Sequence, residues 1–145
     1  MTETDPTVLP TEETFIGILA PEFSGEGPGT LACTVEVRDR LKQPMGIVHG
    51  GVYCAIAETL ASMGAARAVG LTSPSSEAGT PDTVVMGQQN NTTFLRAVTG
   101  GRIRAVASCR HQGRTTQVWQ IEMFDDDDRL CSLAQVTMAV RPARR

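Results

Sequence analysis

Glu58 is a solitary carboxylate in a long run of small and apolar residues. No other residue between Lys42 and Arg67 is formally charged, and Ser62 follows Glu58 by four positions. Residues four apart share one face of a helix, so the hydroxyl is expected beside the carboxylate. A carboxylate on a buried helix must be paired, protonated or functional. The alternative to catalysis is a structural Glu58 at a subunit interface, hydrogen-bonded to a polar neighbour.

Three residues upstream of Glu58 could assist it. His49 and Gly50 stand at the expected start of a helix, where free backbone N–H groups and the positive dipole end favour a developing oxyanion. Gln43, in the approach loop, adds a neutral donor. A carboxylate, an oxyanion site, a neutral donor and a hydroxyl are the parts of an acyl-transfer site. His49 alone is also typical of a structural residue, and no second histidine has metal-ligand spacing, so no metal site is predicted.

The stretch from Gly50 to Val69 is expected to form the helix that positions these residues. It contains no proline and is rich in alanine. Two stripes recur at helical spacing. The apolar stripe is Val52, Ile56, Leu60 and Met63, and the second stripe is Gly51, Ala55, Glu58 and Ser62. Apart from Glu58, the second stripe is made of small residues, which lets another backbone come close.

The remaining chain predicts mostly strands. A short helix is expected within 11–20 and a strand over 31–38, separated by a loop over 21–30 with several glycines and prolines. After a loop over 71–83, strand-like runs cover roughly 83–95, 101–111, 115–125 and 129–141. One helix and about five consecutive strands indicate an α+β domain with an antiparallel sheet packed on one helix. We expect a single domain over 12–145, preceded by a flexible tail over 1–11.

Composition excludes several classes of protein. The chain is 41% hydrophobic and 20% charged, which is typical of a globular protein, and no apolar run approaches the ~18 residues of a membrane span. Its start lacks the pattern of a secretory signal, so a cytoplasmic location is expected. A net charge of −3 argues against nucleic-acid binding. The four cysteines are widely spaced and are expected as buried free thiols. Asp125 to Asp128 are expected in a solvated turn.

Gln43, His49, Gly50, Glu58 and Ser62 fall at the spacing found in hotdog-fold acyl-CoA thioesterases. The chain resembles the Arthrobacter-type 4-hydroxybenzoyl-CoA thioesterase subgroup, and its pattern is most similar to the 1,4-dihydroxy-2-naphthoyl-CoA and phenylacetate-pathway thioesterases. The resemblance covers about residues 30–141 and includes "HQGRTTQVW" and "RLCS". It implies a hotdog fold, in which an antiparallel sheet of about five to six strands wraps around one long central helix.

The same resemblance implies a role for each residue of the motif. Glu58 would be the nucleophile or the general base that activates water, and both roles stay open. The Gly50 N–H would polarise the thioester carbonyl, while Gln43 and His49 would orient the thioester and assist the leaving thiolate. Ser62 would position water or support Glu58. The implied enzyme is an acyl-CoA thioesterase that needs no cofactor.

The resemblance also places the nucleotide of coenzyme A. Arg96, Gly113, Arg114 and Thr115 are the candidates, and arginine can bind phosphate through two parallel hydrogen bonds. The alternative is that both arginines are ordinary solvated side chains. The acyl group stays open between aryl, naphthoyl and medium-chain groups.

Helix geometry predicts a shared site. Gly50 and Glu58 are eight residues apart, which is roughly 12 Å along a helix. One carbonyl therefore cannot use both residues of the same helix. Two antiparallel helices about a two-fold axis solve this, so we expect a homodimer with its active sites at the dimer interface. The resemblance implies the same dimer, often paired again into a homotetramer.

Two other functions compete with hydrolysis. A hotdog hydratase or dehydratase would want an Asp and His pair for proton transfer, and the helix offers Glu58 and no aspartate. A non-catalytic acyl-CoA-binding hotdog domain would not need Glu58 together with Ser62 and Gln43.

Overall fold

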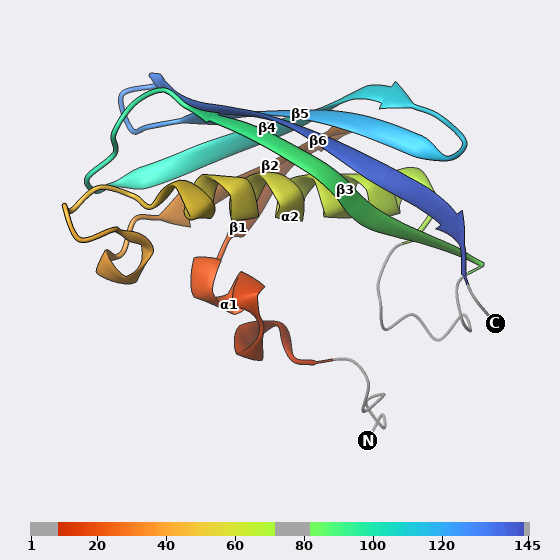
Figure 1. The fold of residues 1–145 in the computed structure, drawn as a ribbon, viewed down its shortest axis with the longest axis horizontal. Helices are drawn as coiled ribbons and strands as arrows, with labels where there is room; N and C mark the ends of the chain where they lie inside the picture. The colour runs from red at the N-terminus through yellow and green to blue at the C-terminus, as the bar shows by residue number, and fades with distance from the viewer. Residues whose placement is uncertain (1–8, 72–81, 144–145) are drawn as a thin grey trace.

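The protein folds as one antiparallel sheet packed against one long helix. The computed structural model describes residues 9–71 and 82–143. The six strands lie in the order β1-β2-β4-β5-β6-β3, and every neighbouring pair is antiparallel. In chain order they are β1 Glu22–Gly27, β2 Thr30–Glu36, β3 Thr83–Phe94, β4 Arg102–Gln112, β5 Thr116–Phe124 and β6 Leu130–Pro142. Figure 1 shows the sheet arched over the helix α2, Gly50–Ala68.

The helix α2 forms where the sequence predicts it, because its apolar stripe has a sheet to cover. Val52, Ile56 and Leu60 are buried, and the strands β2 and β5 contribute buried side chains in strict alternation. On β5 these alternating residues are Gln117, Trp119, Ile121 and Met123. Burial of the two apolar faces against each other is the main favourable contribution to such a fold.

The N-terminal region contains a strand that the sequence did not predict. Residues 21–30 were expected as a loop, yet β1 pairs with β2 from Glu22↔Thr34 to Gly27↔Thr30. Pro28 and Gly29 form the tight turn of a hairpin, and Gly25 lies at a bulge within it. Gly25 and Gly29 adopt positive φ, at the bulge and at the turn respectively. The glycine and proline content therefore indicated where the chain turns. It did not show that the segments on both sides of the turn pair as strands.

Short helices complete the described chain. They are η1 Thr11–Glu13, α1 Phe15–Leu19 and η2 Asp39–Leu41, so the expected helix within 11–20 is two short pieces. Figure 1 shows α1 on the side of α2 away from the sheet. The Arg38 guanidinium donates to the carbonyls of Ile18 and Leu19 at 2.6 and 3.0 Å, which anchors the end of α1 to the segment after β2.

Some predictions fall partly outside the described residues. This applies to most of the expected tail over 1–11 and to most of the expected loop over 71–83. The single domain over 12–145 stays a prediction. Within the ranges that are described, no helix combines the length and the apolar character needed to cross a bilayer.

Gly64 of α2 lies directly against the ring of Trp119 on β5. A Cβ at Gly64 would come within 2.5 Å of the ring, and Trp119 is itself buried and cannot move aside. Gly64→Ala is therefore expected to lower the free energy of unfolding by about 1–3 kcal/mol through overpacking. Helix propensity alone favours alanine over glycine by about 1 kcal/mol. A loss of stability in Gly64→Ala therefore indicates overpacking, whereas a gain indicates that helix propensity dominates.

Denaturant unfolding measures this change. Gly100→Ala is the matched control, because nothing lies within 4 Å of a Cβ at Gly100. A Gly64→Ala chain as stable as the wild type would contradict the tight contact with Trp119.

Candidate functional site

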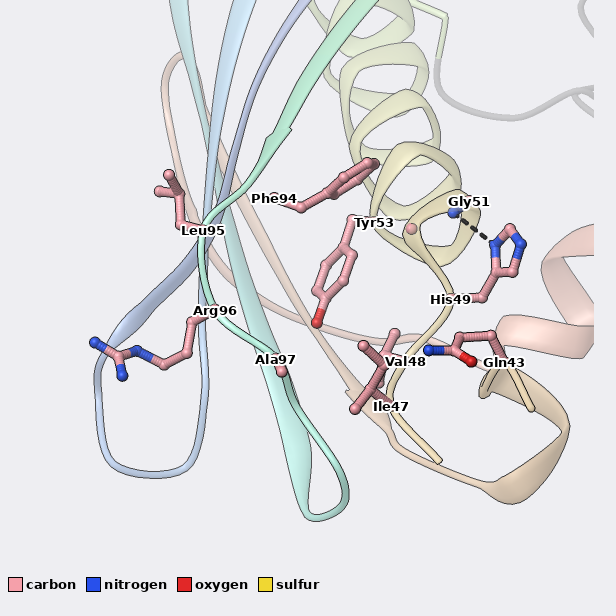
Figure 2. A pocket seen from close by; sticks show the side chains of 11 residues that line it. Gln43, Ile47, Val48, His49, Gly51, Tyr53, Phe94, Leu95, Arg96 and Ala97 are labelled. Atoms are coloured by element: carbon pink, nitrogen blue, oxygen red, sulfur yellow. Dashed lines mark hydrogen bonds between the residues drawn. The ribbon is translucent and has the colours of Figure 1, made fainter. Parts of the chain in front are cut away.

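A cavity of about 630 Å³ opens beside the N-terminal end of α2 (Figure 2). The approach loop, the first turn of α2 and the chain after β3 form its walls. Its lining is Gln43, Ile47, Val48, His49, Gly50, Gly51, Tyr53, Phe94, Leu95, Arg96 and Ala97. Four of the residues expected at the site, Gln43, His49, Gly50 and Arg96, thus lie together.

His49 is the N-cap of α2, and its cap hydrogen bond determines what the ring offers to the cavity. The backbone is extended at His49, and Nδ1 accepts the N–H of Gly51 at 2.9 Å. A neutral imidazole has one donor nitrogen and one acceptor nitrogen. Since Nδ1 is the acceptor, the proton of neutral His49 is on Nε2, which is left as a donor.

Gln43 is oriented in the same way. Its Oε1 accepts the N–H of Met45 at 2.6 Å, so the amide oxygen is occupied by the backbone of its own loop. Figure 2 shows the amide nitrogen on the side of Val48, toward the cavity. Gln43 and His49 therefore each use their acceptor internally and keep a donor for a ligand.

Gly50 supplies a third donor. The first N–H groups of a helix have no partner within the helix. The Gly51 N–H is bound to the His49 side chain and the Val52 N–H to the His49 carbonyl, whereas no acceptor is found for the Gly50 N–H among the described residues. A Cβ at Gly50 would also come within 2.8 Å of the Phe94 ring, so a residue with a side chain does not fit there without a shift.

Glu58 and Ser62 form a separate pair farther along α2. The Ser62 hydroxyl lies 3.3 Å from Glu58 Oε1, as expected for residues four apart. Neither residue lines the cavity. The expectation of a buried carboxylate is wrong for the single chain, where Glu58 is exposed. The apolar stripe of α2 covers the sheet, and the stripe that carries Glu58 therefore faces outward.

The strand β3 runs past this pair and contacts it. A Cβ at Gly87 would lie 2.9 Å from Glu58 Oε1, and the pairing of β3 with β6 shifts between Gly87 and Gln89. Asn90 then donates to the carbonyl of Cys54 at 2.9 Å, which ties the strand to α2. Bulges are common next to active sites, where they redirect a strand.

The remaining expected residues lie at the opposite end of α2. Gly113, Arg114 and Thr115 form the turn between β4 and β5, closed by the Gly113 N–H and the Thr116 carbonyl at 2.8 Å. Gln112, just before the turn, reaches the carbonyl of Ala68 at 3.4 Å. Within one chain this turn is thus separated from Gln43, His49 and Arg96 by the length of the helix.

Tyr53 is a cavity residue that the sequence reading missed. It is only 3% exposed, its ring contacts Phe94 at 5.9 Å between centroids, and its hydroxyl has no hydrogen-bond partner among the residues that the structure describes. An unsatisfied buried hydroxyl costs about 1–3 kcal/mol. Burial, reinforced by Cys131 and the Asp125 carboxylate, raises the pKa of Tyr53 far above its usual range. Its position four residues after His49, on the same face of α2, is the signal that could have identified it.

Within the described residues, the cysteines form no disulfide and the acidic groups are not gathered into a metal site. All four cysteines are free, with Cys33 and Cys131 buried and Cys54 and Cys109 half-buried. Burial raises the pKa of Cys33 to about 12, which keeps it a thiol. Over residues 9–71 and 82–143, no three His, Cys, Asp or Glu side chains are grouped closely enough to hold a metal ion.

Comparison with known proteins gives consistent matches. Residues 45–132 match the model of the thioesterase superfamily. The chain is 35% identical over 129 residues to the 1,4-dihydroxy-2-naphthoyl-CoA hydrolase of Escherichia coli (strain K12), covering 89% of this chain and 88% of that protein. A hydrolase of the same name from Listeria monocytogenes (serotype 1/2a) is 33% identical over 117 residues, covering 81% and 87%. The solved structure of a mutant thioesterase from Pseudomonas aeruginosa is similar with a TM-score of 0.80 and 32% identity, covering 92% and 89%.

The cap hydrogen bond of His49 is open to a stability test. His49→Ala is expected to lower the free energy of unfolding by about 1 kcal/mol, because the Gly51 N–H loses its acceptor. His49→Asn should retain most of the stability, since asparagine is a favourable N-cap residue. Denaturant unfolding of the two variants measures the difference, and ¹⁵N NMR of labelled histidine reports which ring nitrogen carries the proton. Equal stability of the Ala and Asn variants, or a proton on Nδ1 of neutral His49, would contradict the assignment.

Proposed function

Because the chain belongs to the thioesterase superfamily, we propose that it hydrolyses an acyl-coenzyme A to the free acid and coenzyme A. This membership confirms the resemblance found in the sequence and, with it, the hotdog fold. The observation that best supports the proposed substrate is the convergence of three donors on one cavity. Within residues 9–71 and 82–143, no acceptor is found for the Gly50 N–H or for the Nε2 donors of Gln43 and His49.

These donors match the charge that develops during thioester hydrolysis. The carbonyl oxygen becomes an oxyanion, and the Gly50 N–H at the positive end of α2 is suited to stabilise it. The sulfur leaves as a thiolate, for which Gln43 and His49 supply neutral donors. Oriented donors need no reorganisation when charge appears, which is the main source of such stabilisation.

Glu58 is proposed as the group that attacks the carbonyl or activates water. The 3.3 Å contact with Ser62 occupies one carboxylate oxygen and leaves the other available. The distance along α2 from Gly50 to Glu58, ~12 Å, still requires that one carbonyl use Gly50 of one chain and Glu58 of another. The outward orientation of Glu58 in the single chain supports this arrangement, since the carboxylate is accessible to a second copy.

The edge strand β3 is the surface through which two copies would join. It is an edge of the sheet, has 12 residues, and contains no charged residue and no proline. Long exposed edges without such residues pair readily with another strand. The other edge, β1, has only 6 residues, is interrupted by a bulge and carries Glu22. Pairing of β3 with its own copy about a two-fold axis would set the two α2 helices antiparallel, with Gly51 and Ala55 at their approach.

The two-fold arrangement would also bring together the residues that are proposed to bind the nucleotide of coenzyme A. The C-terminal end of one α2 would approach the N-terminal end of the other. Gly113, Arg114 and Thr115 of one copy would then lie toward the cavity of the second copy, which holds Arg96. Both arginines are exposed and available for phosphate.

The acyl group is proposed to be aryl or medium-chain. The cavity walls from Ile47, Val48, Leu95 and Ala97 are apolar, and Phe94 offers an aromatic face. The named relatives act on 1,4-dihydroxy-2-naphthoyl-CoA, which is a bulky aryl ester. A cytoplasmic location and a tetramer stay predictions.

Thiol release tests the proposed function and the role of Glu58. Wild-type protein incubated with benzoyl-CoA and a thiol reagent should release coenzyme A. Glu58→Ala should lower kcat by at least about a thousand-fold, because a nucleophile or base is lost. Its stability should stay close to that of the wild type, since Glu58 is exposed. Ser62→Ala should cost less, because solvent can replace a hydroxyl that only orients water.

Two outcomes separate the alternatives. Binding of benzoyl-CoA without thiol release, across a panel of acyl esters, would support the non-catalytic acyl-CoA-binding domain. Near-normal kcat in folded Glu58→Ala would remove Glu58 from the mechanism.

The shared site predicts complementation. Glu58→Ala and Gln43→Ala chains, each nearly inactive alone, are unfolded together and refolded in equal amounts. In a mixed dimer one site inherits both lesions and the other inherits neither. Half of the dimers are mixed under random pairing, so about a quarter of wild-type activity should return. Two different affinity tags verify that mixed dimers form, and mixed dimers without activity would exclude the shared site.

A further inference from the structure

The edge strand β3 crosses α2 from the C-terminal end of the helix toward its N-terminal end (Figure 1). The strand contacts the helix at three places, and the helix residues involved follow one another by about one turn. The three pairs are Phe94 with Gly50, Asn90 with Cys54, and Gly87 with Glu58. The middle pair is a directional contact, because Asn90 Nδ2 donates to the Cys54 carbonyl at 2.9 Å. Glu58 lies one turn beyond this hydrogen bond.

A bulge in β3 lets both Asn90 and Gly87 face the helix. Asn90 is paired with Val136 and Gly87 with Met138, and both of these β6 residues belong to the core between the sheet and α2. Side chains alternate along a regular strand, so two residues three apart would point to opposite faces. The register shift that follows Gly87 restores the same face. The bulge therefore brings the backbone of β3 against Glu58 and keeps the amide of Asn90 on the helix.

The Asn90 amide is oriented at both of its ends. A carbonyl can only accept a hydrogen bond, so the amide nitrogen faces Cys54 and the amide oxygen faces Thr92. The Thr92 hydroxyl donates to that oxygen at 2.7 Å. Two hydrogen bonds therefore hold a side chain that lies on an exposed edge strand.

The carboxylate of Glu58 is bounded on two sides. The Ser62 hydroxyl lies 3.3 Å from Oε1 on the helix, and the backbone of Gly87 lies beside it on the strand. A Cβ at Gly87 would come within 2.9 Å of Oε1 and within 3.7 Å of the carboxyl carbon. A glutamate side chain loses up to about 2 kcal/mol of rotamer freedom when it is ordered. The place of β3 on the helix therefore limits the positions that this otherwise exposed carboxylate can take.

Resting on the proposed function, we propose that Asn90 is a positioning residue for Glu58. Its amide holds β3 on α2 one turn before Glu58, which keeps the Gly87 backbone against the carboxylate and restricts its direction of attack. Asn90 does not line the cavity, so it acts through the strand and does not touch the thioester. A misplacement of about 1 Å can cost about a hundred-fold in rate, so the loss of this one hydrogen bond is measurable.

Asn90→Ala removes the hydrogen bond, and Asn91→Ala is the matched control. Asn91 is an exposed residue of the same type on the same strand, and it is paired with the exposed Gln135 on the outer face of the sheet. With benzoyl-CoA, Asn90→Ala should lower kcat by about ten-fold or more and change KM by less than about two-fold. Asn91→Ala should change neither constant by more than about two-fold.

Analytical ultracentrifugation verifies that each variant keeps the assembly state of the wild type, and rates are expressed per mole of that assembly. An equal loss of kcat in both variants would overturn the role of Asn90. A loss in Asn90→Ala that disappears when rates are expressed in this way would overturn it too.

Two further variants test the hydrogen bonds themselves. Asn90→Leu retains the size of the side chain without its donor, so it should lower kcat as much as Asn90→Ala does. Thr92→Val retains the branched shape and removes the hydroxyl that orients the amide, so it should lower kcat by a smaller factor of about two to five. A wild-type kcat in Asn90→Leu would show that bulk alone is enough and would overturn the proposal.

Dependence on Glu58 separates positioning from a general loosening of the fold. In the Glu58→Ala background, Asn90→Ala should change the residual rate by less than about two-fold, because no carboxylate is left to position. A further loss as large as that in the wild-type background would contradict the positioning role.

Amide hydrogen exchange separates this inference from the proposed hydrolysis. In an α-helix the N–H of residue 58 bonds to the carbonyl of residue 54, which is the carbonyl that Asn90 also holds. Asn90→Ala should speed exchange of the Glu58 N–H by about five-fold, and Asn91→Ala should leave it unchanged. That result in a wild type that releases no thiol supports the hold of Asn90 on this turn, and only the proposed hydrolysis then fails. Unchanged exchange at Glu58 in Asn90→Ala would overturn the inference whether or not the wild type hydrolyses esters.

Discussion

The helix α2 can bury only one face against the sheet, and the rest of the site depends on this constraint. Val52, Ile56 and Leu60 occupy the buried face, so the helix cannot rotate without exposing them. Glu58 and Ser62 are thereby held on the outward face, and the first turn of the helix is left open beside the cavity. A straight helix also sets the separation of its residues, so the carboxylate and the N-terminal donors cannot converge within one chain.

Short-range backbone contacts then determine the chemistry at the open end of α2. The amide groups of Met45 and Gly51 bind the acceptor atoms of Gln43 and His49, and this leaves both side chains with donors only. The cavity consequently presents hydrogen-bond donors at one side and apolar walls at the other. An electron-rich group attached to an apolar body is the ligand that fits this division, and a thioester has that form.

Much of the fold followed from periodicity, and what did not follow depends on tertiary context. Alternation predicted the strands after residue 83, and helical spacing predicted α2. The strand β1 was missed because Gly25, Pro28 and Gly29 reduce any local strand signal, and the segment becomes a strand only through its pairing with β2. The exposure of Glu58 was missed because its neighbours are small and apolar, although helical spacing had placed it on a different stripe from Val52, Ile56 and Leu60. The burial of Tyr53 depends on packing between segments that are distant in the sequence, which no local pattern contains.

Under the role proposed for Glu58, Gly87 is a position that activity constrains more than folding does. The atom that a side chain at Gly87 would meet is the tip of the Glu58 carboxylate, which is flexible and exposed, rather than the core of the protein. A larger residue would displace that carboxylate while the sheet keeps its pairing. Under that role, a variant at Gly87 would keep a normal unfolding curve and expression level and still lose turnover. Screens that rank mutations by abundance would classify this position as tolerant, and screens that rank them by activity would not.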